Sequence, residues 1–120
     1  MSDNAKRSKW VYEFFEFIDN REFNKILNLV TKDVVYERPG YSTIQGKESL
    51  FNFYSKERVV LEGKHTITNI VTEGSSSVFI GVFSGTLKNK EHIELSFCDF
   101  CQFDNHLLNK RKTFFYSPLI

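Results

Sequence analysis

The feature that most constrains the fold is a change of hydrophobic periodicity near residue 59. Before it, apolar residues recur every three to four positions, as they do on one face of an α-helix. After it, residues 59–116 form four long runs separated by short polar turns. The first is rich in β-branched residues and the second alternates apolar and polar side chains, which is typical of β-strands. Helices followed by consecutive strands predict an α+β domain whose helices pack against a mostly antiparallel sheet.

The first half of the chain is expected to hold three helices and one short strand. The expected helices span residues 5–20, 22–30 and 47–56. In the first of them Trp10, Phe14 and Ile18 fall on one apolar stripe. The strand spans residues 34–37 and stops before Pro39, because proline has no N–H to donate to a sheet.

The expected strands of the second half span residues 59–72, 77–88, 92–103 and 107–116. In the second of them Phe79 and Phe83 face one side, and Ile80 and Val82 face the other. A sheet of this kind, strongly curved over the helices, would form a cone-shaped barrel that encloses an apolar pocket. We expect residues 1–120 to form a single domain.

The composition includes more aromatic side chains than a small core requires. Thirteen Phe, five Tyr and one Trp make up 16% of the 120 residues. The surplus fits a domain that also lines a cavity with rings, although a Phe-rich core without a cavity would give the same composition.

Charge and hydropathy exclude several kinds of partner. The 16 basic and 15 acidic residues give a net charge of +1, so there is no basic field to attract nucleic acid or an anionic membrane. No stretch approaches the ~20 apolar residues of a membrane span, and the N-terminal residues lack the apolar segment of a signal peptide. The sequence therefore predicts a cytoplasmic protein that binds neither nucleic acid nor membrane.

The two cysteines, Cys98 and Cys101, have the C-x-x-C spacing found in many metal and redox sites. They fall on an expected strand, where residues three apart point to opposite faces and cannot bond to each other. No second cysteine pair or neighbouring histidine pair completes a zinc site. We interpret both as small buried apolar residues and expect no metal.

Three segments carry a family resemblance: DNREFNKILNLVTKDVVYERPG, IQGKESLFNFY and SFCDFCQFDNHLL. Over residues 8–116 the chain resembles the nuclear transport factor 2-like superfamily, to which the SnoaL-like polyketide cyclases and the ketosteroid isomerases belong. The resemblance implies a cone-shaped α+β barrel but says little about the chemistry. It also implies a homodimer, because family members often pair through the open face of the sheet.

The ketosteroid isomerase pattern is kept at one of its three catalytic positions. The helical tyrosine that donates to the substrate oxyanion falls on Phe14, and the aspartate that acts as base falls on Arg38. The second oxyanion donor, a buried aspartate, falls on Asp99. Because Phe14 has no hydroxyl and Arg38 stays protonated, the resemblance does not imply ketosteroid isomerisation by that mechanism.

The SnoaL-like cyclases match better, because their single acid/base aspartate also falls on Asp99. This match implies a one-carboxylate proton shuttle for an aldol-type ring closure or a double-bond shift. The limonene epoxide hydrolases use an Asp-Arg-Asp set, for which Asp99 and Arg38 are present but no second carboxylate is placed. Glu37 is adjacent to Arg38 and should point the other way.

Asp99 is the residue most expected to do chemistry. It shares a strand face with Phe97, Cys101 and Phe103, so its carboxyl is partly desolvated and suited to exchanging protons near neutral pH. The alternative is a structural carboxylate satisfied by backbone donors or by Arg38. Arg38 would either bind a substrate carboxylate or enolate, or simply neutralise Asp99.

Other candidates surround these two. His65 lies near the pocket rim in the family layout and could carry a proton, although a lone histidine on a strand is more often packed or solvated. Tyr36 shares strand parity with Arg38 and would face the same side. The expected pocket lining is Phe14, Tyr41, Tyr54, Arg58, Phe83, Phe97, Cys101 and Lys112. For Arg58 and Lys112 the alternative is an ordinary solvated surface position.

Two functions are expected from these residues. The first is an isomerase, cyclase or lyase that acts without a cofactor on a small apolar carbonyl compound, as in secondary metabolism. Asp99 would move the proton, and Arg38, Tyr36 or His65 would stabilise the oxyanion. The second is a non-catalytic domain of the same fold that binds a small ligand or dimerises through its sheet.

Overall fold

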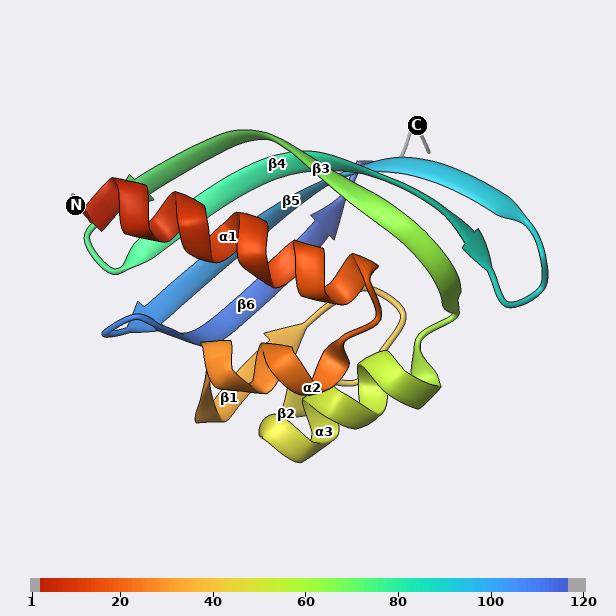
Figure 1. Cartoon of the computed structure of the whole chain (residues 1–120), viewed down its shortest axis with the longest axis horizontal. Coiled ribbons are helices and arrows are strands. Elements are labelled where there is room, and N and C mark those ends of the chain that lie inside the picture. The colour runs from red at the N-terminus through yellow and green to blue at the C-terminus, as the bar shows by residue number, and fades with distance from the viewer. Residues whose placement is uncertain (1–2, 117–120) are drawn as a thin grey trace.

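A strongly curved sheet wraps over a long N-terminal helix in the computed structural model, which describes residues 3–116 (Figure 1). The described residues form three α-helices: α1 (Asp3–Asp19), α2 (Phe23–Ile26) and α3 (Lys47–Asn52). They also form six strands: β1 (Val30–Glu37), β2 (Ile44–Gln45), β3 (Val60–Glu73), β4 (Ser76–Leu87), β5 (His92–Asp104) and β6 (Leu107–Phe115). The predicted α+β architecture is confirmed.

The six described strands form one sheet in the order β2-β1-β6-β5-β4-β3. From β3 to β6 each strand pairs antiparallel with the next, so the meander predicted for residues 59–116 is confirmed. β1 differs, because it pairs parallel with β6 and antiparallel with the two-residue strand β2, which lies outside the strands expected from the sequence. The sheet therefore joins a strand from the first third of the chain to the last described strand.

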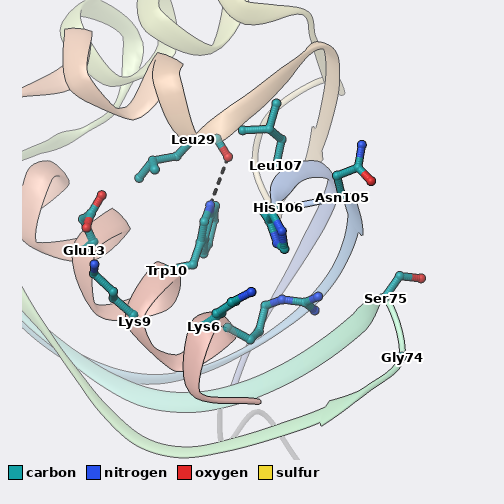
Figure 2. A pocket seen from close by; sticks show the side chains of 11 residues that line it. Lys6, Lys9, Trp10, Glu13, Leu29, Gly74, Ser75, Asn105, His106 and Leu107 are labelled. Atoms are coloured by element: carbon teal, nitrogen blue, oxygen red, sulfur yellow. Dashed lines mark hydrogen bonds between the residues drawn. The ribbon is translucent and has the colours of Figure 1, made fainter. Parts of the chain in front are cut away.

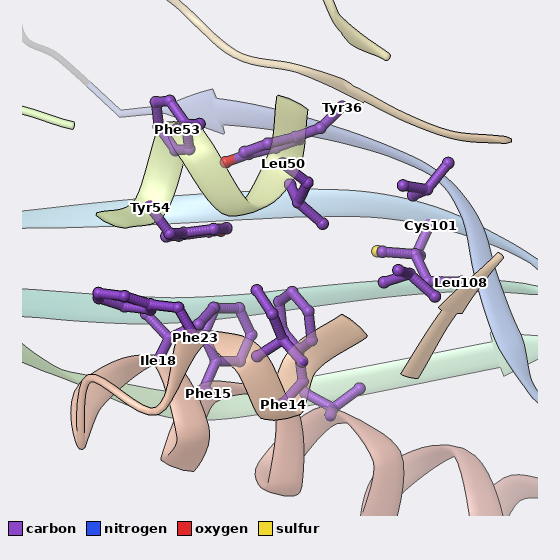
Figure 3. Close-up of a cluster of buried hydrophobic side chains, with 14 of the residues drawn as sticks. Phe14, Phe15, Ile18, Phe23, Tyr36, Leu50, Phe53, Tyr54, Cys101 and Leu108 are labelled. Atoms are coloured by element: carbon purple, nitrogen blue, oxygen red, sulfur yellow. The ribbon is translucent and has the colours of Figure 1, made fainter. Parts of the chain in front are cut away.

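The concave face of the sheet packs on α1, whose apolar stripe supplies the middle of the core (Figure 3). Phe14, Phe15 and Ile18 point from α1 toward the strands and are at most 2% exposed. Trp10 stacks on Phe14 with 4.7 Å between ring centroids. Each buried side chain of this size contributes about 1.5–3 kcal/mol, so packing against the sheet holds α1 in place.

The helix predicted over residues 22–30 is too long. α2 stops at Ile26, a 3₁₀ turn covers Leu27–Leu29, and Val30 already begins β1. Val30 is fully buried and lies opposite Leu108 of β6. Pairing with β6 therefore overrides the helical spacing of the apolar residues, as tertiary context commonly does for β-branched side chains.

The helix predicted over residues 47–56 changes its winding part-way. α3 ends at Asn52, and a π-helical turn covers Phe53–Glu57. Gly46 precedes α3 with φ of +88°, a conformation that glycine adopts without a Cβ clash. The wider turn ends the helical segment at Arg58 and sets the backbone from which that side chain enters the interior.

The two cysteines point to opposite faces of β5, as predicted, and both are free thiols. Cys101 is buried under α1, but Cys98 is only half-buried, so the prediction that both are buried is wrong for Cys98. The odd-numbered positions of this part of β5 face the core, which leaves Cys98 on the outer surface of the sheet. Burial raises the pKa of both thiols, so neither is a ready thiolate.

The outer face of the sheet carries large apolar side chains with no covering layer among residues 3–116. Ile80, Phe100 and Phe114 are 47%, 39% and 50% exposed, respectively. Within the same residues, no helix combines the length and the apolar character that crossing a bilayer requires.

Candidate functional site

A cavity of about 200 Å³ lies between the concave face of the sheet and the chain around Arg58. Its apolar wall comprises Val59, Val60, Phe83, Leu87, Ile93, Leu95, Phe97 and Phe115. Its polar lining comprises Tyr36, Arg38, Arg58, His65, Arg111 and Thr113. Because a cavity of roughly 150 Å³ can hold benzene, this one suits a single ring with a few substituents.

Six of the residues singled out from the sequence lie around this cavity: Tyr36, Arg38, Arg58, His65, Phe83 and Phe97. Asp99 does not line it. The Asp99 carboxylate is fully buried and is hydrogen-bonded to Arg111 and Thr113, whose side chains do reach the cavity.

Asp99 stands at the centre of a buried network that joins β5, β6 and the π-helical turn. Arg111 donates from Nε to one carboxylate oxygen at 2.9 Å, and Thr113 donates its hydroxyl proton to the other at 2.6 Å. Arg111 also donates from Nη1 to the Tyr54 hydroxyl at 2.6 Å. Asp99 lies directly opposite Thr113 in the antiparallel register, so strand pairing itself brings these groups together.

This network decides between the alternatives for Arg38. The buried partner of Asp99 is Arg111 and not Arg38, so the hypothesis that Arg38 neutralises Asp99 is wrong. Burial alone would lower the pKa of Arg111, but Asp99 holds it well above the ordinary value. Arg111 therefore stays charged, and the Asp99 carboxylate serves first to hold that charge in place.

Tyr36 extends the network, and its proton can be assigned. The Tyr36 hydroxyl lies 2.9 Å from the Thr113 hydroxyl. Since Thr113 has one proton and gives it to Asp99, Tyr36 is the donor in this contact. Burial raises the pKa of Tyr36 to about 12, against the opposing effect of Arg111. Tyr36 is thus a neutral phenol whose proton is already committed, which leaves it poorly placed to donate to an oxyanion.

His65 lies mid-strand on β3 and is held by a carboxylate from the last residue of α1. Asp19 accepts from the His65 backbone N–H at 2.8 Å and contacts its Nδ1 at 2.6 Å. A carboxylate only accepts, so Nδ1 carries the proton and Nε2 keeps its lone pair. Burial lowers the pKa of His65 below its ordinary value of 6.5, although the hydrogen bond to Asp19 opposes the shift.

Aromatic rings fix the His65 imidazole from both sides. Its ring centroid lies 4.5 Å from that of Phe15 on α1 and 4.7 Å from that of Phe83 on β4. The Phe83 ring in turn lies close over Gly63 and Gly85, where a Cβ would come within 2.6 Å of ring atoms. These two glycines leave room for the ring that forms one wall of the cavity beside His65.

Arg38 and Arg58 reach the cavity without a carboxylate partner among residues 3–116. The Nε atoms of both are buried and have no hydrogen-bond partner there. Arg58 is 5% exposed, and burial lowers its pKa. The Arg58 prediction of a pocket charge therefore agrees with its position, while the solvated alternative is wrong.

Five of the predicted lining residues lie elsewhere: Phe14, Tyr41, Tyr54, Cys101 and Lys112. Phe14 and Cys101 belong to the core beside α1, and the Tyr54 hydroxyl is taken by Arg111. The Tyr41 hydroxyl accepts the Val59 N–H at 3.1 Å. Lys112 is half-exposed on the outer face and lies 3.7 Å from Glu37, since its strand position alternates with that of Arg111.

A second, more open hollow of about 680 Å³ lies at the other end of α1, near the β3–β4 and β5–β6 turns (Figure 2). Trp10 and Leu29 form part of its wall, and the indole N–H donates to the Leu29 carbonyl at 3.0 Å. Although larger, it contains no buried polar atom left without a partner among the described residues. The two buried side-chain nitrogens without a partner, Arg38 Nε and Arg58 Nε, belong to residues of the smaller cavity.

Sequence reasoning missed three residues that shape the site: Asp19, Arg111 and Thr113. Asp19 was interpreted as the end of a helix, and nothing local marks its contact with a residue 46 positions away. Arg111 is the middle residue of a basic run on an expected strand, but alternation alone does not say whether Arg111 or its two neighbours face inward.

Most of the chain matches one known protein family. The profile of the SnoaL-like domain matches residues 11–109. This chain belongs to the SnoaL-like domain family. A search of curated proteins found no match to the sequence. The predicted resemblance to the SnoaL-like branch of the nuclear transport factor 2-like superfamily is confirmed.

Solved structures share the fold of this SnoaL-like domain at low sequence identity. An LEH-like epoxide hydrolase from M. tuberculosis is 16% identical with a TM-score of 0.80, covering 93% of this chain and 84% of that one. A candidate SnoaL-like polyketide cyclase from Jannaschia sp. is 10% identical with a TM-score of 0.80, over 92% and 85% of the two chains. A protein with a ketosteroid isomerase-like fold from Catenulispora acidiphila, in complex with trimethylamine, is 15% identical with a TM-score of 0.80, over 91% of this chain and 85% of that one.

Proposed function

We propose that this SnoaL-like protein is an enzyme that moves a proton on a small carbonyl compound without a cofactor, as an isomerase, cyclase or lyase does. One observation carries the proposal. A histidine whose pKa is lowered by burial, held by Asp19 and flanked by aromatic rings, lines a largely apolar cavity that also contains guanidinium groups. A base and an anion-stabilising group in one desolvated site are what enolisation requires.

In this proposal His65 takes the role of proton carrier that the sequence assigned to Asp99. His65 Nε2 would remove a proton from the carbon beside the carbonyl, and the electrons of the C–H bond would move to the carbonyl oxygen. Arg58 or Arg38 would stabilise that enolate. Return of the proton from Nε2 to another carbon of a conjugated enolate shifts a double bond. Attack of the enolate carbon on a second carbonyl forms a C–C bond and closes a ring, and the Nε2 proton then passes to the alkoxide formed from that carbonyl.

Asp99 acts through Arg111 in this proposal and is a positioning residue. Both carboxylate oxygens accept hydrogen bonds from buried side chains, so Asp99 has no free edge turned toward a substrate. Its charge keeps Arg111 ionised at the cavity wall, where the guanidinium adds to the positive potential felt by a developing enolate.

Exchange of carbon-bound protons for deuterium tests the proposal without knowledge of the natural substrate. Acetophenone and 2-cyclohexenone, each a single ring, would be incubated with the protein in D₂O, and loss of the signals of protons beside the carbonyl would be followed by ¹H NMR. His65→Gln should lower the exchange rate by about 100-fold or more, and Asp19→Asn should lower it less. Lys64→Gln, on an exposed position of the same strand, is the matched control and should exchange like the native protein.

A non-catalytic binding domain is the second candidate function. It is favoured by the commitment of Asp99 and Tyr36 to internal hydrogen bonds, which removes two of the predicted catalytic groups. The complex of the Catenulispora protein with trimethylamine supports small-molecule binding in this fold. Ring compounds that bind the native protein but never exchange a proton would establish this candidate in place of the first.

We also propose that the protein is a cytoplasmic homodimer that pairs through the outer face of β4, β5 and β6. Ile80, Phe100 and Phe114 supply an apolar surface there, and burying it against the same surface of a second copy would form an isologous interface.

A further inference from the structure

We infer that the substrate of this site carries a carboxylate, which Arg58 and Arg38 bind inside the cavity. The inference deepens the proposed function and rests on it for the view that the ligand is a substrate. The ligand class is a small acid with one apolar ring, because about 200 Å³ leaves room for little more.

The guanidinium groups of Arg58 and Arg38 lack hydrogen-bond and ion-pair partners within the described chain. Arg58 is 5% exposed, yet no hydrogen bond or ion pair from residues 3–116 reaches its side chain. The Arg38 Nε is buried and equally unpartnered. Buried arginines are normally paired, because removing an unpaired charge from water is strongly unfavourable. Arg58 is buried and Arg38 is half-buried, and two unpartnered Nε atoms on one cavity wall favour a partner that comes from outside the protein.

The carboxylates near the cavity already bind other side chains. Asp99 is bound by Arg111, and Asp19 is bound by His65. Within the described chain Arg58 and Arg38 have no ion-pair partner; Asp19 raises the pKa of Arg58 from a distance, whereas the two guanidinium groups repel each other. A monoanionic ligand would relieve that repulsion, whereas a cationic ligand would increase it.

Aromatic rings contact the guanidinium groups of Arg38 and Arg58 and restrict their positions before a ligand binds. The Arg38 guanidinium carbon lies 5.2 Å from the ring centroid of Phe53 and 5.3 Å from that of Phe115. That of Arg58 lies 5.2 Å from the Tyr54 ring. Stacking on rings leaves the N–H edges of a guanidinium free, and those edges match the two oxygens of a carboxylate.

Benzoate and benzamide provide the test, because they have nearly the same shape and differ in charge. Neither has a carbon-bound proton beside its carbonyl group, so neither can be enolised and their binding is independent of catalysis. Titration of the native protein followed by calorimetry should show benzoate binding at least about tenfold more tightly than benzamide, the difference expected for hydrogen bonds to charged groups. Equal affinity for the two compounds would overturn the inference.

Substitutions locate the binding groups. Arg58→Gln and Arg38→Gln should each weaken benzoate binding by about tenfold or more and leave benzamide binding unchanged. Lys110→Gln removes the same charge from an exposed position on the opposite face of β6 and should change neither affinity. If Lys110→Gln weakened benzoate as much as the arginine variants, the preference would reflect net charge and not a built site.

The outcomes separate this inference from the proposed function. Arginine-dependent benzoate binding together with no deuterium exchange on any ring ketone would leave the carboxylate site standing and refute the enzyme. Deuterium exchange that depends on His65, combined with equal affinity for benzoate and benzamide, would support the enzyme and refute the carboxylate site. If Arg58→Gln does not fold, as judged by its circular dichroism, Arg58→Lys retains the charge but loses the planar fork and should still weaken benzoate.

Discussion

Replacing Asp99 by Asn should destabilise the protein severely, because it leaves the Arg111 guanidinium charged and buried without a counter-charge. Arg111 is 4% exposed and Asp99 is 0% exposed, so water cannot take the place of the lost carboxylate. Breaking one side of a buried ion pair removes roughly 3–5 kcal/mol. That is a large part of the roughly 5–15 kcal/mol by which a domain of this size is stable.

The double variant isolates the pair from its surroundings. Arg111→Met alone should be similarly destabilising, because it strands the Asp99 carboxylate. The double variant Asp99→Asn/Arg111→Met removes both charges. Its loss of unfolding free energy should be smaller than the sum of the two single losses by a coupling of about 2–3 kcal/mol. Asp104→Asn, at an exposed position near the end of the same strand, is the matched control and should stay within about 0.5 kcal/mol of the native protein.

Urea unfolding followed by fluorescence suits this measurement, because the one tryptophan, Trp10, is stacked in the core. If Asp99→Asn loses less than about 1 kcal/mol of stability and yet abolishes deuterium exchange, the positioning role of Asp99 is refuted and the carboxylate itself carries the proton. If Asp99→Asn is unfolded without urea, the double variant still reports the coupling.

Three further predictions follow from other parts of the structure. Since burial lowers the pKa of His65 below 6.5, the unfolded chain binds that proton more tightly than the folded one; the free energy of unfolding should fall as the pH drops below 6.5 and through the lower folded pKa, and His65→Gln should make this loss smaller in urea titrations at each pH. Arg58→Met should raise the free energy of unfolding by about 1 kcal/mol, because it removes an unpaired buried charge while conserving packing. Ile80→Asp should convert the proposed dimer to a monomer in analytical ultracentrifugation, since it places a charge in the apolar outer face.

Each of these has a result that contradicts it. A stability profile unchanged by His65→Gln would mean that this imidazole does not titrate as its burial requires. Loss of stability in Arg58→Met would show that Arg58 serves the fold and not a ligand. A native protein that sediments as a monomer at all concentrations would refute the dimer. Glu48→Gln, at an exposed position of α3 and outside the proposed interface, is the control for unspecific effects on assembly.

The sequence identifies which face of β5 is buried, and so places Asp99 correctly, but not the partner of Asp99. The reason lies in the register of β6. Leu108 and Arg111 are both buried although they are three positions apart, because the pairing of β5 with β6 shifts between Gln102 and Phe103. Counting alternate positions from Leu108 would turn Lys110 inward, so strict alternation cannot find Arg111.

The contact between Asp19 and His65 could not be predicted for a different reason. Periodicity describes one element at a time, whereas this contact depends on where the end of α1 meets the middle of β3. Sequence patterns therefore predict part of the apolar wall of the cavity and several of its polar groups. Which of those groups pair with each other is set by packing between elements, and that pairing decides which one is free to react.

The parallel pairing of β1 with β6 has a consequence for how the protein is made. Val30 and Leu108 are neighbours in the sheet, and the hydrogen bond between Tyr36 and Thr113 spans 77 positions. On a ribosome β1 would emerge early and wait, with only the two residues of β2 beside it, until β6 had been synthesised. Contacts between such distant segments slow folding. One edge of β1 would therefore stay unpaired until β6 joins the sheet, and only then would the cavity acquire Arg111 and Thr113.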